Sequence, residues 1–307
     1  MELYGVGRRS RSDVVICYIS DSVDKSVLKR MRKLIQSIDV DALTMNIESL
    51  AECMFTHKWI NPFPKFKYSE RPDTATAAIL DGNIVIMVDN SPAVMIIPAS
   101  IFDIIEEADD FNFSPIVGSY LRITRFFFSI VTWILTPLWL LFINNPDWVP
   151  EFLKFILITD DITVPVLLQL LILELAVDGL KLAAVNTPTM LSTPLSIVAG
   201  IVVGEYAVSS GWFNPEALLY MAVVTVGTYG QTNFEMGYAF KFLRVLMLIL
   251  TQIFNLAGLI TGVVISVLMI AFNRTITGKS YIYPLIPWDG KMLKRKVFRV
   301  RLPHGYK

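Results

Sequence analysis

The sequence predicts an α/β soluble head followed by an α-helical polytopic membrane domain. Charge is the first observation: only 14 of the 54 charged side chains lie within residues 123–272, and the other 40 lie in the flanks. Length is the second, because the apolar runs at residues 123–143 and 245–272 reach the roughly 20 residues that a helix needs to cross a bilayer. The third is composition: mean hydropathy is +0.54 and charged residues make up 18%, against about 25% in an average soluble domain.

The head is predicted to span residues 1–118 and to begin with a strand and an amphipathic helix. Residues 14–19 form an apolar run between polar neighbours, which is typical of a buried strand. Residues 23–38 then place apolar side chains at helical spacing, with lysines and arginines on the other positions. Asp21 or Ser22 is predicted to cap the N-terminus of this helix.

The rest of the head is predicted to alternate short helices with strands. Pro62 and Pro64 flank Phe63 and force an extended segment, because proline fixes its own backbone and restricts the residue before it. Residues 89–92 separate two apolar runs and predict a hairpin. The remaining predicted elements are helices at residues 46–54, 74–80 and 100–108 and hairpin strands at residues 84–88 and 93–97.

No motif for enzyme chemistry is visible in the head. The sequence has no glycine-rich phosphate loop, no His/Cys metal-ligand spacing and no serine nucleophile elbow. Arg71 stands between Glu70 and Asp73, and an ion pair that fixes a loop is favoured over a catalytic pair. His57 and His304 are lone histidines, for which a surface or packing role is favoured over metal ligation. We therefore expect no enzyme activity, no cofactor or metal and no nucleic-acid partner.

Five segments are candidates for crossing the membrane, within a membrane domain predicted at residues 119–273. Arg122 and Arg125 stand at the entrance of the first segment, and a basic tail predicted at residues 274–307 follows the last. Positive flanks favour the cytoplasmic side, so both ends are expected there and the number of crossings should be even. We therefore predict four full spans and one re-entrant or broken segment. The candidates are residues 123–143, 164–185, 196–212, 217–234 and 245–272.

Three smaller features complete the predicted topology. The polar start carries no signal-sequence pattern, so the head is expected to stay in the cytoplasm. The short apolar run at residues 152–158 is flanked by acids and is expected at the outer membrane interface. The pairs Gly200/Gly204 and Gly258/Gly262 each have the spacing that permits close helix contact.

Charged residues inside the apolar segments need a reason, because each costs about 2.5–3.5 kcal/mol at the centre of a bilayer. Glu174, Asp178 and Lys181 share one helical face. They can pair with one another and hold helices together, or part of the trio can line a water-filled path, and both alternatives stay open. Glu205 is alone in its segment and is a further candidate for lining a pore. A solvated rim at the cytoplasmic boundary is favoured for Glu235, Lys241 and Arg244.

Several blocks of the sequence resemble the A-subunit family of spore germinant receptors. Residues 61–98 carry most of the resemblance, together with Gly7-Arg8-Arg9-Ser10 upstream. In the membrane half, residues 137–142, 165–175, 186–193 and 283–288 are also similar. Together these runs look closest to a branch of the family that acts in stage V of sporulation. The matching motif residues are Pro62, Phe63, Pro64, Glu70, Arg71, Pro72, Asp73, Gly82, Asp89, Ser91 and Pro92.

This resemblance implies a role in spore germination and residence in the inner spore membrane. It also implies a ring-like oligomer that conducts small ions, here monovalent cations, and that has membrane lipid and other germination membrane subunits as partners. The motif residues would have structural or coupling roles. Family members usually carry a further soluble subdomain before the block at residues 7–10, so the chain is expected to be shortened at its N-terminus.

Three functions stay open at this point. The first is an ion-conducting subunit, in which Glu174, Asp178 or Glu205 attracts cations. The second is a non-conducting scaffold whose head and basic tail recruit partners and anionic lipid. The third is a transporter with a substrate site near Thr187-Pro188 and Thr193-Pro194.

Overall fold

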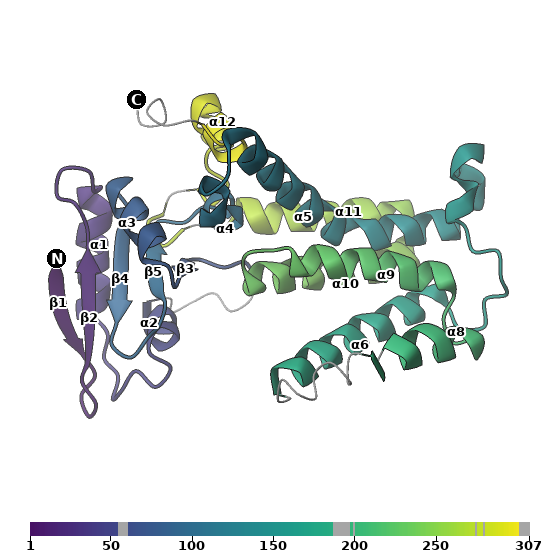
Figure 1. Ribbon diagram of the computed structural model, residues 1–307, viewed down its shortest axis with the longest axis horizontal. Coiled ribbons are helices and arrows are strands. Elements are labelled where there is room, and N and C mark those ends of the chain that lie inside the picture. The colour runs from purple at the N-terminus through teal and green to yellow at the C-terminus, as the bar shows by residue number, and fades with distance from the viewer. Residues whose placement is uncertain (55–60, 187–196, 199, 274, 279, 301–307) are drawn as a thin grey trace. The chain divides into compact units, whose positions relative to one another are not determined.

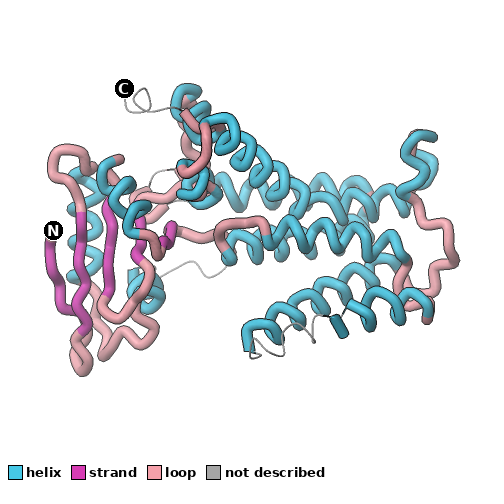
Figure 2. Tube along the Cα trace, viewed as in Figure 1, coloured by secondary structure: helices cyan, strands magenta, loops and turns pink. Residues whose placement is uncertain are grey.

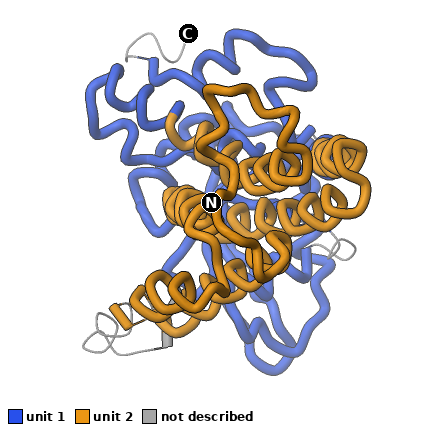
Figure 3. The backbone as a smooth tube through the Cα atoms, turned by 90° about the vertical axis from the view of Figure 1, so that its right-hand side faces the viewer, with its two compact units in different colours: residues 1–123, 268–307 blue, residues 124–267 orange. Residues whose placement is uncertain are grey.

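The computed structural model describes residues 1–54, 61–186, 197–198, 200–273, 275–278 and 280–300. His57, His304 and the two Thr-Pro pairs of the transporter hypothesis lie outside the described residues. The chain divides into two units, one of residues 1–123 with 268–307 and one of residues 124–267 (Figure 3). The tail therefore groups with the head, whereas the sequence had suggested a separate third region. The first unit is called the head unit below and the second the helical unit.

A five-stranded antiparallel sheet forms the centre of the head unit (Figure 1). The predicted hairpin is confirmed: Ile84 pairs with Ile97, and the Ser91 amide donates to the Val88 carbonyl at 3.1 Å. The predicted strand at residues 14–19 begins and ends two residues earlier than expected, and two further strands were missed. In spatial order the strands are β1 (Glu2–Val6), β2 (Ser12–Cys17), β4 (Ile84–Val88), β5 (Val94–Ile97) and β3 (Lys67–Ser69).

Helices cover both faces of this sheet. α1 (Lys25–Gln36) and α2 (Ile47–Met54) bury their apolar sides against one face, and α3 (Pro72–Leu80) places Ala75 and Ala78 against the other. The predicted cap of the first helix is wrong. Asp24 caps it instead, because the Ser22 and Val23 amides already donate to the Ile19 carbonyl in a preceding turn.

The helix predicted at residues 100–108 is shorter than expected. α4 (Ile101–Ile105) begins with a capping box, in which Ser100 and Asp103 each accept a hydrogen bond from the other's backbone amide. The helix ends at Ile105, and a separate 3₁₀ turn, η1 (Ala108–Phe111), follows.

The segment after residue 272 packs as part of the head unit. Tyr281 is completely buried, its carbonyl accepts from the Ile101 amide at 3.0 Å, and its ring lies 6.3 Å from that of Phe63. Asp289 caps the short helix α12 (Gly290–Val297), which carries Lys291, Lys294, Arg295 and Lys296. The described part of the predicted basic tail is therefore folded against the head rather than extended in solvent.

The helical unit consists almost entirely of helices in its described part (Figure 2). Among the described residues, two helices are long and apolar enough to cross a bilayer: α5 (Pro115–Asn144) and α10 (Phe234–Phe254). Both α5 and α11 cross the division between the two units. The remaining elements are the 3₁₀ turns η2 (Pro146–Trp148) and η3 (Glu151–Ile156), the helix α6 (Val166–Asn186), the π-helix η4 (Ile201–Tyr206), α8 (Ala207–Ser209), α9 (Pro215–Tyr229) and α11 (Leu256–Ala271).

Two of the predicted segment boundaries are wrong. The segment predicted at residues 217–234 ends at Tyr229, and Asn233 then caps α10. The segment predicted at residues 245–272 begins earlier, with α10 at Phe234, and it is broken at Asn255, which adopts a φ of 54°. A break agrees with the prediction of one re-entrant or broken segment, although its position was not predicted. Hydropathy cannot detect this break, because residues on both sides of Asn255 are equally apolar.

Glycines allow α11 to approach α10 closely after the break. A Cβ added at Gly258 would lie 1.8 Å from the Leu250 carbonyl oxygen, and one at Gly262 would lie 2.5 Å from Met247 Cγ. The close contact predicted for this pair is present. A Cβ added at Gly200 or Gly204 meets no described atom within 4 Å, so the other pair makes no such contact there.

Candidate functional site

A buried ionic cluster joins α6, α10 and α5 within the helical unit. Arg244 Nε donates to Glu174 Oε1 at 2.6 Å, and the two residues are 2% and 4% exposed. Arg244 Nη1 also donates to the Thr132 carbonyl of α5. The attraction between these two buried charges offsets the free-energy cost of removing each from water. If either residue were lost, the remaining charge would carry its full desolvation penalty.

Lys241 neutralises the second acid of α6. Its ammonium donates to Asp178 Oδ2, donates to the Glu174 carbonyl at 3.0 Å and lies 3.5 Å from Glu174 Oε2. Asp178 Oδ1 is buried and has no hydrogen-bond partner among the described residues. The cluster thus matches two carboxylates with two cations, and no surplus negative charge is left.

This arrangement corrects two interpretations. The trio on α6 does not pair within itself, because Glu174 and Asp178 take their partners from α10. Lys241 and Arg244 are therefore not a solvated rim. The sequence showed the spacing on each helix but not that the two charged faces meet.

Lys181 contacts aromatic rings. Its ammonium lies 4.9 Å from the ring centroid of Tyr229 and 5.6 Å from that of Tyr238. Such distances are typical of cation–π contacts. Among the described residues Lys181 makes no ion pair.

Glu205 lies in a different environment. It is exposed on η4, and its neighbours Ile201, Val202 and Tyr206 are also exposed, by 42%, 52% and 65%. A carboxylate thus stands on a surface whose other side chains are mainly apolar.

The motif residues Arg71, Pro72 and Asp73 lie at the start of α3, where they make an ion pair and begin the helix. Arg71 donates to Asp73 Oδ2 at 2.7 Å and also pairs with Asp109. The Arg71 hydrogen bond, together with one from the Thr74 amide, lowers the pKa of Asp73 to about 2. Glu70 is exposed and makes no ion pair in the described part of the chain. Pro72 occupies the first turn of α3, where its missing amide hydrogen costs nothing.

The other motif residues shape turns and core. Phe63 is 2% exposed, and Pro64 is buried next to it. Gly82 has a φ of 86°, and an added Cβ would lie 2.6 Å from the Ser22 carbonyl oxygen, so the position requires glycine. Asp89, Ser91 and Pro92 form the hairpin turn between β4 and β5, and Pro62 precedes Phe63 in the extended segment.

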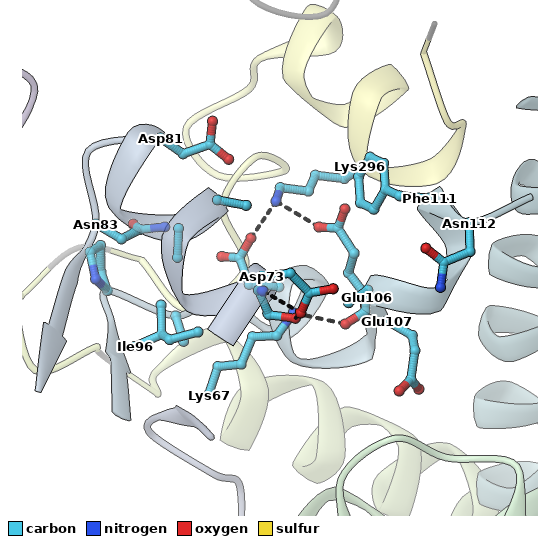
Figure 4. Close-up of a pocket in the computed structure, with 17 residues that line it drawn as sticks. Lys67, Asp73, Asp81, Asn83, Ile96, Glu106, Glu107, Phe111, Asn112 and Lys296 are labelled. Atoms are coloured by element: carbon cyan, nitrogen blue, oxygen red, sulfur yellow. Dashed lines mark hydrogen bonds and ion pairs between the residues drawn. The ribbon is translucent and has the colours of Figure 1, made fainter. Parts of the chain in front are cut away.

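A second ionic cluster, which sequence reasoning missed, borders a cavity of about 300 Å³ in the head unit (Figure 4). Lys296 of α12 lies 2.5 Å from Asp103 Oδ1 and 2.9 Å from Glu106 Oε2. Burial opposes the charged form of Lys296, but the two carboxylates outweigh it and the pKa of this lysine is raised. Lys67 donates to the Glu106 carbonyl at 2.8 Å, and burial lowers the pKa of its ammonium.

Arg122 extends this cluster to the first turns of α5. It is 2% exposed and donates to Glu106 Oε1 at 2.6 Å, to Asp110 Oδ2 at 3.1 Å and to the Arg295 carbonyl at 3.1 Å. The sequence marked Arg122 only as a membrane-flanking charge. The acid-rich stretch at residues 103–110 between two basic regions was the available signal for this pairing.

The chain matches a known protein-family model over its full length. The model of the Bacillus/Clostridium GerA spore germination protein matches residues 1–307. The chain belongs to the GerA family. The resemblance inferred from residues 61–98 and the membrane-half motifs is thereby confirmed.

Named members of the GerA family are similar over almost the whole chain. Stage V sporulation protein AF of Bacillus subtilis (strain 168) is 36% identical over 298 residues, which is 97% of this chain and 60% of that protein. Spore germination protein GerLA of Bacillus cereus is 26% identical over 97% of this chain and 60% of its own length. The chain thus spans about 60% of the length of these curated GerA relatives.

One solved structure of a GerA-family domain is also similar. It is the N-terminal domain of the A subunit of the Bacillus megaterium spore germinant receptor GerK3. The sequence identity is 33%, the match covers 31% of this chain and 74% of that domain, and the TM-score is 0.24.

Proposed function

We propose that this GerA-family chain is a spore germination membrane protein that forms an oligomer and conducts monovalent cations. The observation that carries the proposal is the exposure of Glu205 among exposed apolar side chains on η4. A carboxylate facing lipid costs about 2.5–3.5 kcal/mol at mid-bilayer, and contact with water removes that penalty. A ring of such carboxylates around an aqueous path would attract cations.

The paired acids of α6 have a different part in this proposal. Glu174 is buried against Arg244, and Asp178 is paired with Lys241, so both contribute to packing rather than to the path. This assignment leaves Glu205 as the lining acid among the three candidates. It also gives α10 its role, which is to hold α6 through two charged contacts.

The surface of the helical unit suits lipid and neighbouring copies. Large apolar side chains are exposed along its helices, including Leu219 (62%), Val226 (63%), Phe242 (59%) and Ile253 (65%). Exposed apolar surface on this scale marks contact with a membrane or with other subunits. Lipid, other copies of the chain and other germination membrane subunits are the partners that we propose.

The break at Asn255 supports a topology with both ends in the cytoplasm of the inner spore membrane. It separates α10 from α11 within the fifth predicted segment. Six helical segments are therefore available in the described part of the chain: α5, α6, η4 with α8, α9, α10 and α11. An even number of membrane crossings returns the chain to the side of the membrane on which Arg122 and Arg125 lie.

Potassium flux into liposomes tests the conducting role. The full chain, alone or with its partner subunits, is expected to pass potassium, and Glu205→Gln is expected to reduce the flux. Glu151→Gln changes an exposed acid of η3 with no part in the proposed path and is the matched control. Absence of flux in both preparations would defeat the proposal.

A non-conducting scaffold is the second candidate, and the neutral ionic cluster of α6 and α10 favours it. A membrane unit whose α6 acids are matched by buried cations can serve assembly alone. The scaffold predicts that Glu205→Gln leaves ion release from germinating spores unchanged. Deletion of residues 291–301 would then weaken assembly with partner subunits.

A further inference from the structure

Lys181, near the C-terminal end of α6, makes no ion pair with any residue that the structure describes. Asp178, the nearest acid in sequence, is committed to Lys241. The residues that follow α6, 187–196, contain no Asp or Glu, so the sequence offers no partner there. The cluster of Glu174, Asp178, Lys181, Lys241 and Arg244 therefore keeps one positive charge, and it lies on Lys181.

The surroundings of Lys181 are aromatic and outward-facing. Tyr229 and Tyr238 flank the ammonium at 4.9 and 5.6 Å and are themselves 60% and 36% exposed. Phe234, next to them, is 84% exposed. Tyrosines with one exposed side and a lysine that extends along them are typical of the boundary between acyl chains and headgroups.

The end of α9 and the start of α10 lie next to Lys181. α9 ends at Tyr229 and α10 begins at Phe234, and both residues line one small cavity with Lys181, Gly237 and Tyr238. That cavity holds only about 20 Å³. One water molecule needs roughly 10–15 Å³ of such space, so the cavity admits about one water, and a larger counter-ion would lie at its mouth. Lys241 also lines it, but its ammonium is used by Asp178 and Glu174.

We propose that Lys181, Tyr229 and Tyr238 form a binding site for the phosphate headgroup of an anionic phospholipid. The lysine supplies the charge, and the two rings hold it in place. The exposed apolar side chains Val226 (63%) of α9 and Phe242 (59%) of α10 lie about one turn closer to the bilayer centre than the tyrosines and receive the acyl chain. The proposed topology places this end of α6 in the cytoplasmic leaflet. The proposal depends on the membrane placement given above but not on ion conduction.

Native mass spectrometry of the full chain in detergent tests this site. The probes are phosphatidylglycerol and phosphatidylcholine with the same acyl chains. Wild type is expected to retain phosphatidylglycerol in preference, and Lys181→Gln is expected to weaken its binding about fivefold, the effect of one basic residue at an anionic surface. Phosphatidylcholine binding should not change. Because no flux is measured, failure of this test is separate from failure of the conducting role.

Matched variants make the outcome specific. Lys154→Gln removes an exposed lysine of η3 and should bind phosphatidylglycerol like wild type. Lys181→Arg keeps the charge over the rings and should retain the lipid, and Tyr238→Phe keeps the ring and should do so as well. Equal binding of both lipids, or wild-type binding by Lys181→Gln, would overturn the proposal. Displacement of the lipid by excess inorganic phosphate would do the same, because it would assign the site to a soluble anion.

Discussion

The Nε atom of Arg244 lies 2.6 Å from Oε1 of Glu174, and both side chains are almost completely buried between α10 and α6. Removal of either partner leaves a charge without a counter-charge, which typically costs about 3–5 kcal/mol. We therefore expect Arg244→Met to lower the free energy of unfolding by about that amount, as measured by denaturation in detergent.

A double variant distinguishes the effect of losing the ion pair from the effect of leaving one buried charge unpaired. Glu174→Leu combined with Arg244→Met removes both charges and is expected to recover most of the lost stability, because well-packed apolar side chains can replace a buried ion pair. Glu151→Gln breaks an exposed contact with Lys154 and should change stability by less than about 0.5 kcal/mol. If the double variant were as unstable as Arg244→Met, the pairing would not be the source of the effect.

Asn255 sets the break between α10 and α11. Its φ is 54°, and it exchanges two hydrogen bonds with Asn145, at 2.6 and 2.9 Å. Asn255→Ala is expected to lower stability by about 1–3 kcal/mol, because alanine resists positive φ and removes the amide pair. Asn255→Gly tolerates the positive φ but loses the amide pair, and Asn145→Ala loses the same pair and leaves Asn255 in place. Both should therefore cost less than Asn255→Ala, as thermal unfolding of the three variants would show.

Replacement by alanine is expected to destabilise the protein at Gly258 but not at Gly204. Gly258→Ala forces a Cβ against the Leu250 carbonyl and is expected to cost about 1–3 kcal/mol. Gly204→Ala meets no described atom within 4 Å and should be tolerated in the isolated chain. Thermal unfolding of the two variants in the same detergent tests the difference, and equal effects would contradict the packing of α11 on α10.

Asp103 makes the head unit sensitive to acid. Burial alone would raise the pKa of Asp103, but the Lys296 ammonium outweighs it and the net pKa is lowered. A lowered folded-state pKa means that the stabilisation is present above the unfolded value of about 3.9 and is lost as pH falls through the folded value. Asp103→Asn should remove this acid-dependent loss, measured as unfolding against pH, whereas Asp21→Asn at an exposed position should retain it.

The head shows how far local sequence patterns reach. The hairpin and the helices at residues 23–38, 46–54 and 74–80 follow from periodicity and turn residues, and all are present. β1 and β3 were missed because their own sequences lack a clear strand pattern. Hydrogen bonding to β2 and β5 holds them in the extended conformation. Strand pairing is a tertiary property, and short edge strands depend on it most.

In the helical unit, contacts between helices are not encoded in local sequence patterns. Spacing placed Glu174, Asp178 and Lys181 on one face, but spacing on α6 says nothing of which helix lies opposite. Lys241 and Arg244 were therefore assigned to solvent, although they are the partners of those acids. Likewise, the break at Asn255 lies inside a continuous apolar run, and only its backbone conformation reveals it.

Access of water to Glu205 is the claim on which the conducting role depends. In a chain whose Cys17 and Cys53 have been replaced, Glu205→Cys in the assembled membrane complex should react with a membrane-impermeant thiol reagent, and the reaction should block potassium flux. Leu175→Cys, at a position 72% exposed on the apolar surface of α6, should stay unreactive. An unreactive thiol at position 205 in complexes that still conduct would contradict the proposed path.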